Sequence, residues 1–203
     1  MLRNRFEKLV GKYTTNLSLI DELWNEIERN YSDENRHYHN LIHLENMMKE
    51  VDEVIKKILN HDSILFSLFY HDIIYNPSKN NNEEKSAELA VKRMKEIGIQ
   101  NSDIEDTKKQ ILATKSHHSE DNDTLYLIDA DLSILGQAPE VYSNYSANVR
   151  KEFRIYPDFI YKPGRKKVLL SFLETERIFK TDYFHQKYEK AARMNIENEL
   201  KAS

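Results

Sequence analysis

The segment ILFSLFYHDIIY, residues 64–75, is apolar at almost every position and carries His71 and Asp72 side by side. A segment this apolar is expected to lie in the interior of the protein. Burying an ionised carboxylate there is costly unless a partner compensates its charge. A bound metal ion would be such a partner, because imidazole and carboxylate groups are common metal ligands. A hydrogen-bonded His–Asp pair in the core explains the same residues, so the segment alone leaves both interpretations open.

On both sides of this segment, apolar residues recur at intervals of three and four, which is typical of amphipathic helices. The alternating pattern of strands is absent from the sequence. We expect helices over about residues 17–27, 41–59, 86–97, 125–135, 139–156, 166–179 and 183–200, and one more that opens at Ser102. The pattern therefore predicts an all-α, single-domain helical bundle in which helices from about 139 to 200 pack on the core.

Polar residues and prolines mark the expected helix ends. Asp62 or Ser63 is the expected N-cap of the apolar segment. Residues 102–105, Ser-Asp-Ile-Glu, have the spacing of a capping box. Pro157 and the pair Pro163–Gly164 are expected to break the chain between the C-terminal helices.

The composition fits one domain over residues 1–203, with 32% charged and 39% hydrophobic residues. The absence of cysteine excludes disulfides and thiolate metal sites. The net charge of -4 gives no general attraction to nucleic acid or to acidic membranes. No apolar run is long enough to span a bilayer, and the N-terminus lacks the apolar core of a signal peptide. We therefore expect a cytoplasmic protein with no nucleic-acid or membrane partner.

Further histidines and acids accompany the His71–Asp72 pair. His39 and His43 are four residues apart and would share one face of a helix. Residues 128–132, Ile-Asp-Ala-Asp-Leu, place two carboxylates in another apolar helix. Side chains from facing helices commonly build ligand sites inside bundles. Such a set suits Mn, Fe, Co, Ni or Zn better than Ca.

The order His43, His71–Asp72, Asp131 resembles the metal-binding signature of the HD-domain phosphohydrolases. The chain is also similar, over about residues 5–200, to a bacterial branch of predicted metal-dependent HD phosphohydrolases. The segments that carry this resemblance are YHNLIH (38–43), YHDIIYNP (70–77), NEEKSA (82–87), VRKEF (149–153) and Gly164–Arg165. The resemblance implies a helical bundle of the HD-domain type and a divalent metal cofactor, with Mg also allowed.

The resemblance implies roles for individual positions. His43, His71, Asp72 and Asp131 would bind the metal. His39 lies where the distantly related cyclic-nucleotide phosphodiesterases keep a histidine that protonates the leaving group. Those enzymes have a second-metal histidine shortly after the His–Asp pair, and this chain has none there, so we expect a single ion.

The two aspartates of residues 128–132 point to different helix faces, and normally only one can reach an ion. Asp131 is favoured as the fourth ligand because it matches the family pattern better, whereas Asp129 would orient a ligand or act as a structural acid. Glu83 follows a polar loop and would serve as a general base, or as an ordinary acid of a first helical turn. His117 would contact phosphate or water, or simply end a helix.

Lysine and arginine residues near the family segments are candidates for binding phosphate. Arg150 and Arg154 are four residues apart and would grip one anion together, because arginine offers two parallel donors to phosphate oxygens. Charges at this spacing also occur on the solvated face of a helix. The phosphate-binding candidates are Lys115, His117, Arg150, Arg154 and Arg165.

These observations predict a metal-dependent phosphohydrolase that uses a metal-activated water on a nucleotide or another small phosphate ester. His39 and Glu83 would carry protons. Two alternatives stay open: a metal-containing module that binds or senses a nucleotide without turnover, and a di-iron oxygenase of the HD type. The sequence also leaves open a homo-oligomer.

Overall fold

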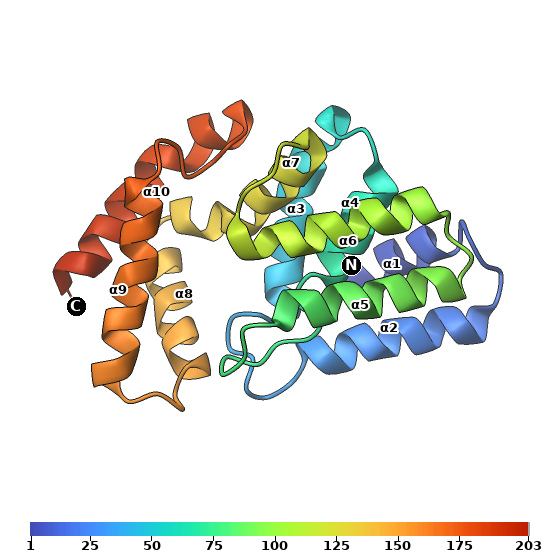
Figure 1. Ribbon diagram of the computed structural model, residues 1–203, viewed down its shortest axis with the longest axis horizontal. Helices are drawn as coiled ribbons and strands as arrows, with labels where there is room; N and C mark the ends of the chain where they lie inside the picture. Colours follow the sequence, from blue (N-terminus) through green and yellow to red (C-terminus); the bar gives the residue numbers. More distant parts are fainter. Residues whose placement is uncertain (203) are drawn as a thin grey trace.

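The computed structural model describes residues 1–202, which form an all-helical bundle (Figure 1). Within this range the chain forms ten α-helices and two short 3-10 helices, and no strand. Their bounds are α1 (Leu2–Val10), α2 (Leu17–Tyr31), α3 (Leu41–Val54), η1 (Ile55–Lys57), α4 (His61–Tyr70), α5 (Asn82–Glu96), α6 (Asn101–Ser116), α7 (Asn122–Leu132), η2 (Ser133–Gly136), α8 (Pro139–Glu152), α9 (Asp158–Glu174) and α10 (Asp182–Ala202). The all-α prediction is confirmed, although α1 was not among the expected helices.

Helix α4 lies at the centre of the bundle because it is apolar around its whole circumference. Helices α1, α3, α5, α6 and α7 all pack against it. Its inward hydroxyl groups also find partners: Ser63 and Ser67 both donate to the Gln110 side chain of α6, at 2.8 and 2.7 Å. Burial of Ser63 and Ser67 therefore leaves neither hydroxyl unpaired.

Two helices start at other residues than predicted, and the acids expected near their starts form hydrogen bonds with residues far away in the sequence. Asn60, and not Asp62 or Ser63, caps α4 by accepting the Ser63 N–H at 3.1 Å. Asp62 instead accepts a hydrogen bond from the Tyr13 hydroxyl at 2.7 Å. The predicted capping box at residues 102–105 is also wrong, since α6 begins one residue earlier and Asp103 accepts a hydrogen bond from the Asn60 side chain.

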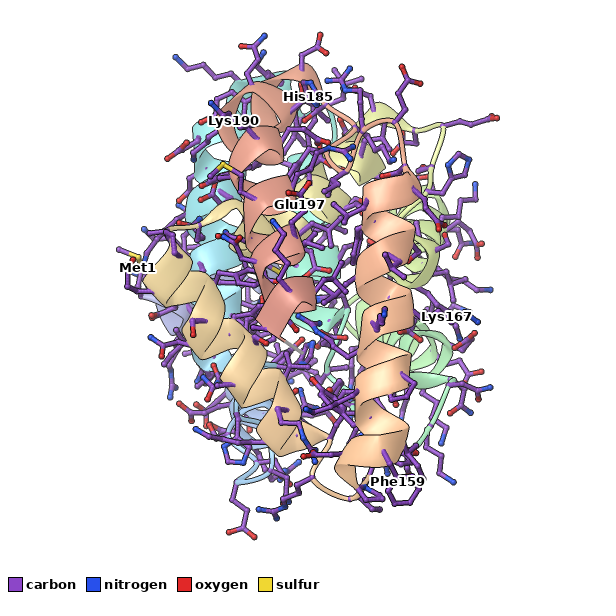
Figure 2. The ribbon with its side chains drawn as sticks, turned by 90° about the vertical axis from the view of Figure 1, so that its left-hand side faces the viewer. Met1, Phe159, Lys167, His185, Lys190 and Glu197 are labelled. Carbon is purple, nitrogen blue, oxygen red and sulfur yellow. The ribbon has the colours of Figure 1, made fainter. Side chains whose placement is uncertain are left out.

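Helices α8, α9 and α10 form a layer at one end of the molecule (Figures 1 and 2). Helix α10 packs against η2, where Gly136 permits a very close approach: a Cβ at Gly136 would lie 2.5 Å from the Tyr188 Cβ. A second contact ties this layer to the core: the buried Asp129 of α7 accepts hydrogen bonds from the backbone N–H groups of Lys180 and Thr181, at 2.9 and 2.7 Å. The C-terminal layer is thus tied directly to the helix that carries Asp131.

The break predicted at Pro163–Gly164 is wrong, because α9 runs through both residues. Pro163 has no N–H to donate to the carbonyl of Phe159, four residues earlier. Phe159 is 78% exposed, so water is at hand for that carbonyl. A surface helix tolerates a proline at such a position better than a buried helix does. The break occurs earlier, since α8 ends at Glu152 and not near residue 156.

None of the helices formed by residues 1–202 is both long enough and apolar enough to cross a bilayer.

Candidate metal centre

Four side chains from three segments converge beside the C-terminal end of α4. The His43 and His71 Nε2 atoms lie 3.2 Å apart, and the His43 Nε2 lies 3.2 Å from an Asp131 carboxylate oxygen. Asp72 places an oxygen 3.2 Å from the His71 Nε2. The donor atoms of His43, His71 and Asp131 all lie within 4.8 Å of one another. This spacing allows one ion to be held between them.

The end of α4 orients these ligands. His71 follows the last helical residue, and its Nδ1–H donates to the carbonyl of Leu68 at 3.0 Å, which directs the Nε2 lone pair towards the other ligands. Arg36, to which the sequence reasoning assigned no role, donates to the carbonyls of Asp72 and Ile73 at 2.7 and 2.8 Å. Its buried guanidinium therefore fixes the turn that carries the His–Asp pair.

The electrostatics of the cluster correspond to a site for a cation. Burial lowers the pKa of His71, but the carboxylates of Asp72 and Asp131 raise it by more, to about 9. Burial raises the pKa of Asp72, and the neighbouring imidazoles outweigh this and hold it well below its ordinary value. The pKa of His43 is lowered, chiefly by burial, which keeps its imidazole neutral. Two carboxylates and two imidazole nitrogens in a buried space match the ligands that transition metals prefer.

The two aspartates of α7 have separate roles, as their spacing predicts. Asp131 joins the cluster, whereas Asp129 points away from it and is fully buried. Asp129 accepts a third hydrogen bond, from the Thr181 hydroxyl at 2.7 Å. The structure therefore places Asp129 as a structural acid that holds the chain between α9 and α10.

His39 lies in the turn before α3 and not on the helix, because Asn40 is the N-cap of α3. The expectation that His39 and His43 share a helix face is thus wrong, yet the turn still brings their rings to 5.9 Å. The His39 Nε2 lies 3.9 Å from an Asp72 oxygen, and its ring stacks on Tyr75 at 4.3 Å. His39 therefore adjoins the cluster from outside.

Glu152 is the site residue that the sequence reasoning missed. Its buried carboxylate accepts hydrogen bonds from the Tyr38 and His39 N–H groups at 2.7 and 2.9 Å, from the His39 Nδ1–H at 2.7 Å and from the Tyr75 hydroxyl at 2.9 Å. Burial lowers the pKa of His39, but Glu152 and Asp72 raise it by more. Glu152 lies in the segment VRKEF (149–153) that carries the family resemblance, but its sequence neighbours gave it no role of its own.

One cavity is lined by two of the ligands, and a second meets the cluster at His39, whose Nε2 lies 3.9 Å from an Asp72 oxygen. The smaller one, of about 260 Å³, is lined by His43 and Asp131. The larger one, of about 620 Å³, is termed the aromatic cavity here, and its lining includes His39, Tyr75, Glu83, His117, Tyr145 and Arg165. Both predicted proton carriers, His39 and Glu83, therefore face the same space.

His117 lines the aromatic cavity from the C-terminal end of α6. It has a left-handed backbone, with φ of 52°, and burial lowers its pKa. Its ring lies 5.5 Å from Phe172 of α9, so it bridges the core and the C-terminal layer. His118, the next residue, is exposed.

The predicted phosphate-binding cations are mostly engaged elsewhere. Lys115 pairs with Glu84 at 2.6 Å, and Arg150 pairs with Asp158 at 2.7 Å. Arg154 lies beyond the end of α8 and donates to Asn35, so it does not grip an anion together with Arg150. Arg165 does line the aromatic cavity, where both of its outer donors hold Glu199 or Tyr145.

No protein-family model, curated protein or solved structure matches this chain. The chemistry of the site has to be inferred from its own donor atoms and from the cavity beside them.

Proposed function

We propose that this chain is a cytoplasmic, metal-dependent phosphohydrolase of the HD-domain type that acts on a nucleotide or another small phosphate ester. The observation that carries the proposal is the convergence of four ligands next to His39, which lines the aromatic cavity together with Glu83; the ligands are His43, His71, Asp72 and Asp131. A purely structural His–Asp pair needs neither the second pair of ligands nor a cavity lined with groups that can transfer protons.

The residues of the cluster fit one ion of Mn, Fe, Co, Ni or Zn, and Mg is also allowed. When bound, such an ion would supply a hydroxide nucleophile near neutral pH and would neutralise charge on the phosphoryl group. His71 is already oriented for binding by Leu68, and Arg36 holds the turn around Asp72.

The chain itself would handle the protons. Glu152 accepts the Nδ1–H of His39 and stabilises the protonated imidazole, which would donate its Nε2 proton to the leaving alkoxide. Glu83, which lines the same cavity, would accept the proton that water loses on attack. Its carboxylate lies 3.5 Å from the Lys115 ammonium group.

The test combines metal content with phosphate release. Protein purified without chelator goes to elemental analysis and then to a panel of nucleotides and small phosphate esters with added Mn, Co, Ni or Mg. We expect roughly one ion per chain and phosphate release, both lost in Asp72→Asn. Asp106→Asn, the same change at an exposed position outside the site, should alter neither.

Two results would contradict the proposal. Metal content and turnover that survive in Asp72→Asn would exclude this cluster as the centre. Bound metal with no phosphate release from any ester would point to a binding module or to oxygen chemistry, and iron-dependent oxygen uptake would separate those two.

A further inference from the structure

We propose that the aromatic cavity takes the leaving group of the substrate and that the substrate is a phosphate monoester whose leaving group carries a planar aromatic ring system. Gly164 provides the space for it. The inference rests on the proposed function, because it assigns the cavity to the same reaction.

The lining of the cavity favours a flat, apolar occupant. Tyr75 and Tyr145 face it from the core side and from α8, and Phe153, Tyr156 and Tyr161 add three more rings. Aromatic rings bind other rings by stacking and edge contacts in addition to apolar burial. The stack of His39 on Tyr75 places the predicted proton donor in the same wall. A ring bound here would therefore lie next to the atom that protonates its departing oxygen.

The charge of the lining indicates a single phosphate. Apart from the proton donor His39, its cations are Lys79 and Arg165, and its acid is Glu83. Arg165 is largely neutralised, because it makes a two-point contact with Glu199 at 2.8 and 3.1 Å. A chain of phosphates usually requires several free lysine or arginine donors. Within residues 1–202, Lys79 is the one lysine or arginine of this cavity that forms no ion pair with an acid, so the phosphate belongs at the metal centre and the remainder of the substrate is uncharged.

One face of helix α9 also favours an apolar ligand. Ile160, Gly164 and Val168, spaced by four residues, all line the cavity. Ile160 and Val168 are 50% and 48% exposed, so apolar surface faces the cavity without a protein partner. Helix α9 lies on the outer face of the molecule, with Phe159 and Lys167 along it (Figure 2). A bound aromatic group would cover the two aliphatic side chains.

Gly164 forms a notch between Ile160 and Val168. A Cβ built there meets no atom within 4 Å. Glycine inside a helix costs about 1 kcal/mol relative to alanine, so local helix stability does not explain it. Every larger side chain at this position would enter space that the cavity needs for its occupant.

The first test measures binding without turnover. Benzylphosphonate, cyclohexylmethylphosphonate and methylphosphonate cannot be hydrolysed, and their affinities for the protein as purified are measured by titration calorimetry. We expect benzylphosphonate to bind about tenfold more tightly than methylphosphonate and clearly more tightly than the saturated ring. Equal affinity of the two ring compounds would overturn the aromatic preference, and no advantage of either over methylphosphonate would overturn the cavity assignment.

Two variants locate the effect. Gly164→Leu fills the notch with a good helix former and should abolish the advantage of benzylphosphonate while methylphosphonate keeps its affinity. Ser171→Leu makes a comparable change at an exposed position of α9 outside the cavity and should change neither affinity. If benzylphosphonate binds to Gly164→Leu as tightly as to the parent protein, Gly164 does not shape the site.

Turnover separates the inference from the proposed function. We expect kcat/KM for adenosine monophosphate to exceed that for adenosine triphosphate by about tenfold, and the reverse order would overturn the single-phosphate assignment. Turnover of glycerol phosphate and phenyl phosphate at equal kcat/KM would leave a phosphohydrolase but sink the inference. Selective binding of benzylphosphonate with no turnover of any ester would support the aromatic ligand class but contradict the proposed hydrolase activity.

Discussion

Helices α4 and α9 show opposite relations to the protein interior. Seven of the ten residues of α4 are buried, whereas Leu169 is the one buried residue among the 17 of α9. The short helix orients His71 and Asp72 at its end, and packing on all sides holds them in place. The long helix presents Ile160, Gly164 and Val168 to the aromatic cavity. It is held by Leu169, Phe172 and Leu173 against the core and by the ion pair Arg165–Glu199.

This difference separates the chemistry from the selection of substrate. Ligands on packed elements keep their geometry, since every displacement disturbs many neighbours. Side chains on an exposed helix that lines a cavity can be replaced with little effect on the packing of the core. We therefore expect changes beside α4 to affect metal binding and changes in the C-terminal layer to affect proton transfer, stability or ligand size.

The largest effect is expected at the metal cluster. Asp131→Asn should lower metal affinity and phosphate release by about 100-fold or more, because losing even a group that only orients a ligand costs 10- to 100-fold. Elemental analysis and initial rates measure both losses. The metal-free variant should unfold at about the same urea concentration as the metal-free parent. Unchanged metal content would remove Asp131 from the set of ligands.

Asp129, the other acid of α7, should affect the stability of the fold and not the binding of metal. Asp129→Ala leaves the N–H groups of Lys180 and Thr181 without their buried acceptor and should lower the free energy of unfolding by about 3 kcal/mol. Urea denaturation measures the loss, and the folded fraction should still bind metal. A loss below about 1 kcal/mol would show that the C-terminal layer is held by other contacts.

Glu152 links the C-terminal layer to the chemistry. Glu152→Gln should lower kcat by about 10- to 100-fold with metal content unchanged. The carboxylate raises the pKa of His39, so its removal lowers that pKa, and activity that needs protonated His39 should disappear at a lower pH on the alkaline side. A pH–rate profile measures this shift. A uniform loss at every pH would indicate a structural role alone.

The pair of Arg165 and Glu199 should make the C-terminal layer sensitive to acid. Burial raises the pKa of Glu199, but Arg165 lowers it by more, to below its ordinary value. Its contribution to stability is therefore present above about pH 4.5 and is lost as the pH falls through the lowered pKa. Glu199→Gln should cost about 1.5 kcal/mol at pH 7 and less at pH 3, as followed by thermal unfolding. An equal cost at both pH values would contradict the ion-pair explanation.

The smallest effect is expected on α9. Gly164→Ala should raise the free energy of unfolding by about 0.5 to 1 kcal/mol, because alanine is the better helix former and its Cβ meets no atom within 4 Å. Chemical denaturation measures the gain, with Ser171→Ala as the control on the same helix. Destabilisation by Gly164→Ala would mean that the helix needs a backbone freedom that the structure does not show.

Much of the fold could be predicted because helical spacing is a local property. The apolar spacing of residues 17–27 and the full apolar surface of α4 depend only on nearby residues, and both correspond to observed helices. The caps were predicted less well. Asn60 replaces Asp62 as the cap of α4 because Asp62 bonds to Tyr13, which is 49 residues away in the chain.

The residues of the candidate site also differ in whether local sequence could identify them. Acids placed in apolar segments could be recognised from the sequence, because burial of an unpaired charge is costly in any fold. Glu152 could not be recognised, since its hydrogen bonds to Tyr38 and Tyr75 span 114 and 77 residues. Arg150 and Arg154 were grouped by their spacing, yet α8 ends between them and separates their side chains.

The sequence by itself determined that the chain is helical, that α4 is buried and that an ionised Asp72 beside His71 needs its charge compensated. Only the tertiary structure decided which acid of α7 reaches them, which carboxylate holds His39 and which face of α9 borders the aromatic cavity. The physical reason is range: helix formation and the cost of burying a charge follow from neighbouring residues, whereas the direction of a side chain towards a site depends on how distant helices pack.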